Sequence, residues 1–280
     1  LPGRAPVLSL FADQAEQRMV IWMIRTEKLC CGYGSRMVLQ NVSLSMEAGE
    51  LWCVLGANGV GKSTLFKTLL GLLKPMGGTV LVDGRPVEQW SRAEFARRVS
   101  YVPQGHTPPF PFKVWEVTAM GRNPYQRGIG RLSREDRRVV AEALEILGIE
   151  RLAGEIYTRI SGGERQLTLL ARAIAQQTPV MFLDEPVSNL DFGNHARVLR
   201  HVRDLTAMGK TVVMTTHCPD HAFFPESRVV LLDRGGVICT GRGTDVVTEK
   251  LIRRMYGVDN RIVVLNRGDG EAERVCVADC

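Results

Sequence analysis

The sequence predicts an α/β fold with a mostly parallel core sheet, an antiparallel β ribbon and an inserted helical lobe. Short uninterrupted apolar runs, typical of strands buried on both faces, are separated by helical patterns or, before the last run, by a short helical turn. Residues 37–46 instead alternate between apolar and polar side chains, as expected for an antiparallel ribbon. The predicted buried strands are LWCVL at 51–55, VMFLD at 180–184, TVVMTT at 211–216 and RVVLLD at 228–233.

The helical lobe is predicted for about residues 105–160, where the strand patterns stop. Ser133 is a candidate N-cap, because the apolar residues after it recur every three or four positions, which is the period of a helix. These apolar residues are Val139, Val140, Ala143, Leu144 and Leu147.

Three segments are expected along the chain. A main domain covers 23–257 and contains the lobe. Residues 1–22 precede it as an N-terminal extension with no period that joins the core, which we expect to be disordered or no genuine part of the chain. Residues 258–280 form a tail with two strand-like runs around the turn Asp269-Gly270, which predicts a β-hairpin.

Composition narrows the classes of function. No window approaches eighteen uninterrupted apolar residues, so a transport function would need a channel from another chain. The net charge is +6, but the densest arginine run, at 131–138, is interleaved with Glu135 and Asp136, which favours a solvated helix face over nucleic-acid binding. The seven cysteines show neither zinc-site spacing nor a disulfide framework, which indicates reduced thiols in a cytosol.

A phosphate-binding loop follows the first buried strand. The run GANGVGKS at 56–63 lies between that strand and an apolar helix, LFKTLLGLL, which is the context that the G-x-x-x-x-G-K-[ST] pattern requires. Glycines let backbone N–H groups converge on a polyphosphate, Lys62 can reach its β and γ groups, and Ser63 can ligate Mg²⁺. The predicted nucleotide-binding residues are Gly56, Ala57, Asn58, Gly59, Val60, Gly61, Lys62, Ser63 and Thr64.

Polar side chains at the ends of other predicted strands complete a candidate hydrolytic site. Asp184 can hold a magnesium ion, and Glu185 has the position to polarise an attacking water. Gln104, after SYVP, could contact the metal or the water, and His217, after VVMTT, could contact the γ-phosphate. Tyr33, between two glycines, could stack on an adenine. For Gln104, His217 and Tyr33 a purely structural role is the alternative.

A second glycine-rich segment, RISGGERQL at 159–167, needs a separate explanation. Ser161, Gly162 and Gly163 can open a helix whose N-terminus is an anion site with almost no side-chain bulk. The P-loop at 56–63 already provides a phosphate site for the chain's own nucleotide, so a second anion site in the same chain needs another ligand.

Six motifs, in their order along the chain, resemble those of ABC ATPases. GANGVGKST, YVPQ, ISGGERQ, VMFLDEP, SNLD and TTH are similar to the Walker A, Q-loop, signature, Walker B, D-loop and H-loop of that family, and the resemblance covers about residues 24–257. Ile160 departs from it, because the family usually has leucine before the signature serine. The resemblance implies the P-loop NTPase fold of ABC ATPases, with ATP and Mg²⁺ as cofactors.

The resemblance also implies an explanation for the second glycine-rich segment. ABC ATPases form head-to-tail dimers, in which Ser161, Gly162 and Gly163 of one subunit would cover the ATP on the P-loop of the other. Asp191 would lie at the same interface between the two subunits. We therefore expect an ATP-hydrolysing homodimer, peripheral to the cytoplasmic face of the inner membrane, with separate permease chains and, indirectly, a substrate-binding protein; nucleic acid is not an expected partner.

The cargo is also suggested by resemblance. Residues 105–128 and the ending LIRRMYGVDNRIVVL resemble subunits that power the import of ferric siderophores, haem or cobalamin. The first of these stretches carries four aromatic residues that could contact a permease or be buried in the lobe: Phe110, Phe112, Trp115 and Tyr125. A soluble scaffold ATPase of the iron–sulfur assembly type, or an importer of molybdate or zinc, is the alternative.

Overall fold

The computed structural model describes residues 24–105, 110–126, 132–188, 190–266 and 272–279. They form two compact units. The helical unit is Trp90–Val212, and the P-loop unit consists of the described residues of 24–89 and 213–279. The predicted extension 1–22 and Met23 lie outside the described residues.

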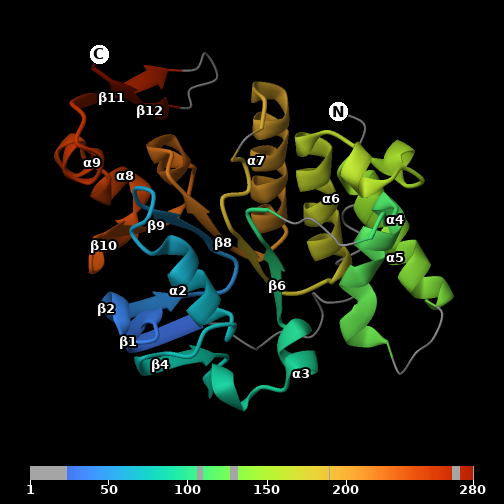
Figure 1. Ribbon diagram of the computed structural model, residues 1–280. Helices are drawn as coiled ribbons and strands as arrows, with labels where there is room; N and C mark the ends of the chain where they lie inside the picture. Colours follow the sequence, from blue (N-terminus) through green and yellow to red (C-terminus); the bar gives the residue numbers. More distant parts are fainter. Residues whose placement is uncertain (1–23, 106–109, 127–131, 189, 267–271, 280) are drawn as a thin grey trace. The chain divides into compact units, whose positions relative to one another are not determined.

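An antiparallel sheet in the P-loop unit contains the predicted ribbon. Its strand order is β2-β1-β4-β5, and β1 pairs with both β2 and β4, with Ile24 opposite Met46 and Val82 (Figure 1). Val42, Leu44 and Met46 of β2 are buried in alternation, as the sequence pattern indicated, but the alternation breaks at Gln40 and Asn41, which are both exposed. The bounds are β1 Ile24–Tyr33, β2 Arg36–Met46, β4 Gly77–Val82 and β5 Arg85–Pro86, followed by the 3₁₀ helix η1, Val87–Gln89.

The parallel sheet of the P-loop unit has the strand order β10-β9-β3-β8. Strand β3 (Leu51–Leu55) is buried along its whole length and pairs in parallel with β9 (Arg228–Asp233), while β10 (Gly236–Arg242) is antiparallel to β9. Strand β8 (Thr211–Thr216), where the chain passes from the helical unit into the P-loop unit, is also wholly buried. Continuous burial on both faces explains the uninterrupted apolar runs and confirms the predicted α/β fold with a mostly parallel core sheet.

Helix α2 (Lys62–Leu69) follows β3 and ends earlier than its apolar run suggested. The run continues to Leu73, but Gly71 adopts a left-handed φ of 65°. A left-handed glycine just past the last helical residue is a common way for a helix to end. The apolar pattern therefore overestimated the helix by a turn.

In the helical unit, two parallel strands carry a layer of helices. Strands β6 and β7 pair from Val99 opposite Val180 to Val102 opposite Leu183. Helices α4, α5 and α6 pack against one another (Figure 1), and α5 buries Val139, Val140, Ala143 and Leu144 behind the N-cap Ser133. The bounds are α3 Arg92–Ala96, β6 Val99–Val102, α4 Val114–Ala119, η2 Met120–Tyr125, α5 Arg134–Ile146, η3 Glu150–Leu152, η4 Tyr157–Arg159, α6 Gly162–Ala175, β7 Val180–Leu183 and α7 Phe192–Ala207.

The C-terminal residues of the P-loop unit form a two-stranded hairpin that contacts the segment after β8. The backbone N–H of Cys276 in β12 donates to Asp220 Oδ1 (2.7 Å) in η5, and the N–H of Ile262 in β11 donates to Glu249 Oε1 (2.8 Å) in α9. The hairpin is therefore hydrogen bonded to two other elements of its unit. The bounds are η5 Pro219–Phe223, α8 Gly243–Val246, α9 Glu249–Tyr256, β11 Asn260–Asn266 and β12 Ala272–Ala278.

None of the helices in the described part of the chain is long and apolar enough to cross a membrane.

A buried arginine joins three elements of the helical unit. Arg122 in η2 is 6% exposed, and its Nε donates to Asp136 Oδ1 of α5 at 2.8 Å. Its Nη1 donates to the carbonyl of Ala175 at the end of α6 (2.9 Å) and to Gln177 Oε1 (2.7 Å). The guanidinium also stacks over the ring of Tyr125, 4.1 Å from the ring centre.

We predict that Arg122→Ala lowers the free energy of unfolding by about 3–5 kcal/mol, because it leaves the largely buried carboxylate of Asp136 without its cation. Urea denaturation measures this change. Arg253→Ala is the control, since its ion pair with Asp259 is exposed on both sides and contributes little. Equal shifts of the urea midpoint in the two variants would contradict the structural role of Arg122.

Candidate functional site

The P-loop lies between β3 and α2, and three of its glycines are required for different reasons. Gly59 and Gly61 have left-handed φ values of 81° and 112°, which side chains disfavour. At Gly56 the obstacle is steric, because a Cβ would lie 2.9 Å from the carbonyl oxygen of Leu232 and 2.8 Å from Val60 Cγ2. The backbone of the loop therefore favours glycine at these three positions, and its role in holding phosphates stays a prediction.

The cation of the loop is held over the loop's own backbone. Lys62 is 5% exposed, and its Nζ donates to the carbonyl oxygens of Gly56 (2.8 Å) and Ala57 (3.2 Å). Helix α2 has no acidic residue in its first turn, so no carboxylate there offsets the positive end of its dipole. The ammonium and the helix N-terminus together favour an anion at this loop. The other predicted loop residues are Asn58, which is exposed, Ser63, which is half-buried, and Val60 and Thr64, which are buried.

His217 and Tyr33 also belong to the P-loop unit. His217 is exposed and follows Thr216, whose carbonyl oxygen accepts a hydrogen bond from the N–H of Gly56 (3.4 Å). The end of β8 therefore contacts the start of the loop, as expected for strand ends of a parallel sheet. Tyr33 is 47% exposed and pairs with Arg36 at the end of β1. An exposed ring is available to a ligand, and simple core packing does not account for it.

In the helical unit, the structure brings Asp184 to Tyr101. Asp184 is 4% exposed, and its N–H donates to the carbonyl of Val102 (2.8 Å) across the β6–β7 pair. The Tyr101 hydroxyl donates to Asp184 Oδ2 at 3.4 Å. Burial, together with the adjacent Asp184 carboxylate, raises the pKa of Tyr101 to about 12, so the hydroxyl keeps its proton near neutral pH. Sequence reasoning did not assign a role to Tyr101, although it lies inside the YVPQ motif.

Glu185 is held in an uncommon backbone conformation beside Gln104. Its φ is 46°, and its carbonyl oxygen accepts hydrogen bonds from both the N–H (3.1 Å) and the hydroxyl (3.0 Å) of Ser188. Left-handed backbone at a non-glycine residue is costly and is concentrated at functional sites. Gln104 Nε2 donates to Glu185 Oε2 at 3.0 Å. Two of the predicted residues, from separate strand ends, therefore meet through their side chains.

Ser161 is the N-cap of α6, as predicted. Its hydroxyl accepts from the N–H of Glu164 (3.3 Å), while its own N–H donates to Glu164 Oε2 (3.0 Å), forming a capping box. Hydrogen bonds from the Ser161 backbone and hydroxyl lower the pKa of Glu164, so this carboxylate is ionised at the helix N-terminus. Glu164 is a residue that our sequence reasoning missed. The serine-to-glutamate spacing of a capping box could have revealed it.

Asp191 is the N-cap of α7. It accepts hydrogen bonds from the N–H (2.9 Å, Oδ1) and from Nδ2 (2.6 Å, Oδ2) of Asn194, and these bonds lower its pKa. Asn189, two residues before Asp191, lies outside the described part of the chain. Ser161 and Asp191 thus each begin a helix of the same unit.

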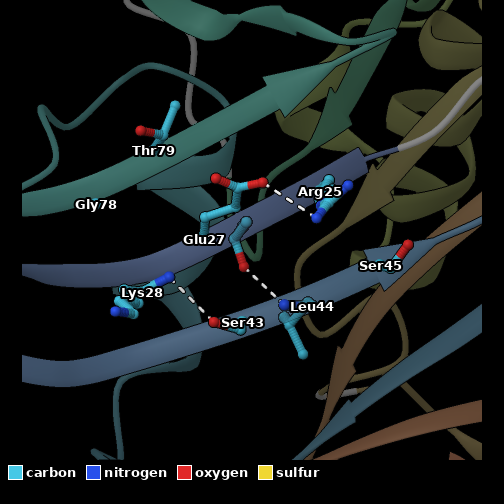
Figure 2. A pocket seen from close by; sticks show the side chains of 9 residues that line it. Arg25, Glu27, Lys28, Ser43, Leu44, Ser45, Gly78 and Thr79 are labelled. Atoms are coloured by element: carbon cyan, nitrogen blue, oxygen red, sulfur yellow. Dashed lines mark hydrogen bonds and ion pairs between the residues drawn. The ribbon is translucent and has the colours of Figure 1, made fainter.

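A cavity of about 820 Å³ lies elsewhere in the P-loop unit, on the antiparallel sheet (Figure 2). Its polar groups are largely engaged with one another: Thr26 Oγ1 accepts from the N–H of Leu44 (2.9 Å), and Ser43 Oγ accepts from the N–H of Lys28 (3.0 Å). None of the predicted site residues lines it. The lining residues are Arg25, Thr26, Glu27, Lys28, Ser43, Leu44, Ser45, Gly78 and Thr79.

Phe110 is exposed, whereas Phe112 and Tyr125 are both half-buried. The Phe110 side chain is 63% exposed and makes an edge contact with half-buried Phe112, with the ring centres 6.0 Å apart. Tyr125 instead packs inside the helical unit, where its hydroxyl donates to the carbonyl of Gln176 (2.9 Å). Half-buried Trp115 belongs to α4. The aromatic segment is therefore partly core and partly surface.

Comparison with known proteins agrees with the motifs and the geometry. The ABC transporter family profile matches residues 39–188. The chain is 40% identical to the hemin import ATP-binding protein of Nocardia farcinica, over 79% of this chain and 76% of that protein. It is 33% identical to the iron(3+)-hydroxamate import ATP-binding protein of Bacillus subtilis, over 86% of this chain and 90% of that protein.

Among solved structures, a chain of a transporter assigned to the metal-chelate type of ABC transporters, in an inward-facing conformation, superimposes with a TM-score of 0.82 at 28% identity. The match covers 94% of this chain and 98% of that one. The fold, the nucleotide loop and the relatives lead to one conclusion: the chain belongs to the ABC transporter family, as an ATP-binding subunit with ATPase activity.

Proposed function

We propose that this subunit powers the import of a metal chelate, such as a ferric siderophore, haem or cobalamin, through a separate permease. The observation that carries the proposal is the agreement of relatives: proteins named for hemin and for iron(3+)-hydroxamate import match most of the chain at 40% and 33% identity. The stretch at 105–128 and the C-terminal ending support the same branch. We place the subunit at the cytoplasmic face of the inner membrane.

The proposed chemistry is hydrolysis of ATP. The loop glycines and Lys62 hold the β and γ phosphates, consistent with the cradle at 56–64 and its buried ammonium. The proposed base is Glu185, which orients the attacking water with the help of Gln104, to which it is hydrogen bonded. His217 contacts the γ-phosphate, and the exposed ring of Tyr33 stacks on the adenine.

Magnesium is part of the same proposal. Its ligands would be the hydroxyl of Ser63, the amide oxygen of Gln104 and the carboxylate of Asp184, all oxygen donors of the kind that Mg²⁺ prefers. In support, the Asp184 carboxylate is buried and accepts a hydrogen bond from a Tyr101 hydroxyl that remains protonated. When bound, the ion neutralises charge that develops on the transferring phosphoryl group.

We propose further that two copies act together. The signature segment of one subunit, Ser161–Gly163, closes over ATP bound to its partner. Asp191 lies at the same interface between the two subunits. In support, Gly162 has nothing within 4 Å of the position that a Cβ would take, so the start of α6 is open to an approaching phosphate. Permease subunits and, indirectly, a substrate-binding protein complete the proposed assembly.

Glu185→Gln should lower ATP turnover about 10²–10⁴-fold, because the amide cannot take the proton from water, and should trap an ATP-bound dimer. Gel filtration with ATP and Mg²⁺ measures the dimer. Adding Gly162→Trp should dissolve that dimer, since the indole would fill the open space at the start of α6. A monomeric single variant, or a dimer that survives the second change, would count against the two-subunit site.

Phe110→Ala combined with Phe112→Ala should leave basal ATPase activity within about twofold, because the pair lies on a partly exposed segment. We expect the same variant to lose stimulation of its ATPase by the permease, since exposed aromatic side chains are typical contacts at protein interfaces. ATPase assays with and without the reconstituted permease measure both quantities. Full retention of stimulation would show that the contact lies elsewhere.

Deletion of the gene should abolish growth of the source organism when a ferric siderophore or haem is the sole iron source, or when cobalamin must be imported. Complementation with the natural chain should restore growth, and Glu185→Gln should not. The carbon source, amino acids and free metal salts serve as controls. A defect confined to molybdate, zinc, an amino acid or a sugar would refute the proposed cargo.

A further inference from the structure

The two glycines of the signature segment face different surroundings. Gly162 has nothing within 4 Å of the position that a Cβ would occupy. At Gly163, by contrast, a Cβ would lie 2.6 Å from Cγ and 3.1 Å from Cβ of Asn194, in the first turn of α7. Real Cβ contacts are longer than the first of these distances. Gly163 therefore lacks a side chain because Asn194, from the same subunit, occupies the space.

The same asparagine holds the N-cap of α7. Its Nδ2 donates to Asp191 Oδ2 at 2.6 Å, and its backbone N–H donates to Asp191 Oδ1 at 2.9 Å. The Asp191 carboxylate accepts both bonds, and they lower its pKa, so it remains ionised and an acceptor down to acidic pH. Both oxygens of Asp191 are thus oriented by one residue.

We propose that Asn194 is a positioning residue that sets the D-loop aspartate, Asp191, against the signature turn at Ser161–Gly163. Its side chain occupies the space beside Gly163 where a Cβ would lie, and its N–H groups direct the Asp191 carboxylate. This inference rests on the proposed function, in which the two motifs of one subunit act on ATP bound to the partner. Asn194 would contact neither the nucleotide nor the attacking water molecule, and would act only through Asp191 and Gly163.

The contact has a direct consequence for how substitutions combine. Gly163→Ala must displace Asn194, which disturbs Asp191 as well as the signature turn. Shortening Asn194 to alanine removes the Cγ and amide atoms that the new methyl group would meet. If the contact positions the motifs, the two changes are not additive, because the second relieves the strain that the first introduces.

The test is a double-mutant cycle in the Glu185→Gln background, with ATP-driven dimerisation as the readout. Gly163→Ala and Asn194→Ala should each weaken dimerisation, the first by about tenfold. The double variant should be about as weak as Asn194→Ala alone, because the amide that the new methyl group would displace is already gone, a coupling within the range measured for residues in contact. Gly154→Ala is the matched control, since a Cβ there meets nothing within 4 Å. Simple additivity of Gly163→Ala and Asn194→Ala would overturn the proposal.

Asn194→Asp separates packing from hydrogen bonding. The aspartate has the same shape, so it keeps the contact with Gly163, but its side chain cannot donate to Asp191 Oδ2 and places a second carboxylate beside it. We expect dimerisation to be weakened at least as much as by Asn194→Ala. The Kd for ATP of the monomeric full chain, measured at low protein concentration with a fluorescent ATP analogue, should stay unchanged. Natural dimerisation in Asn194→Asp would overturn the role of the donor.

The melting temperature separates failure of this inference from failure of the proposed function. If the Glu185→Gln protein does not dimerise with ATP, the two-subunit site is wrong. The steric coupling of Gly163 with Asn194 is then measured by thermal unfolding of the four proteins of the cycle: the parent, the two single variants and the double variant. A non-additive change in melting temperature supports the contact, and an additive change overturns it. If Asn194→Ala lowers the melting temperature by more than Gly163→Ala does, Asn194→Ser takes its place in the cycle, because serine keeps a short hydrogen-bond donor at position 194.

Discussion

Burial of the parallel strands on both faces determines where polar chemistry is possible in this molecule. Every residue of β3, β7 and β8 is buried, and charged side chains within such strands would have no water and no room. Functional polar groups can therefore appear only where the strands end. The P-loop follows β3, Asp184 and Glu185 follow β7, and His217 follows β8.

At the ends of β3 and β7 the chain turns sharply out of the extended conformation, and residues with left-handed φ values make the turns possible. Gly59 and Gly61 supply left-handed residues between β3 and α2. After β7 the same conformation falls on Glu185, which has a side chain and therefore requires support. Ser188 provides it, with two hydrogen bonds to the Glu185 carbonyl. The local backbone cost at Glu185 is thus offset by a neighbour three residues along the chain.

The strands, the P-loop and the helix caps were predictable because their signals are local. Burial on both faces gives an apolar run, and Ser133 and Ser161 cap their helices with an acidic residue three positions later. The end of α2 was misplaced because an apolar run continues past Gly71. Tyr101 and Asn194 could not be predicted. Their contacts with Asp184 and Gly163 join segments about thirty to eighty residues apart, and no local pattern encodes such an approach.

The hairpin of β11 and β12 bears on how the protein is handled in the laboratory. Its Cys276 N–H is hydrogen bonded to Asp220, a half-buried carboxyl group whose pKa burial raises, three residues beyond His217. Shortening the chain before β11, as is common when a tail is trimmed for crystallisation, would remove that donor and uncover η5. In a trimmed protein, the segment that follows His217 would have lost its contacts with the hairpin. Kinetic constants are therefore best compared between versions of the protein that keep the hairpin.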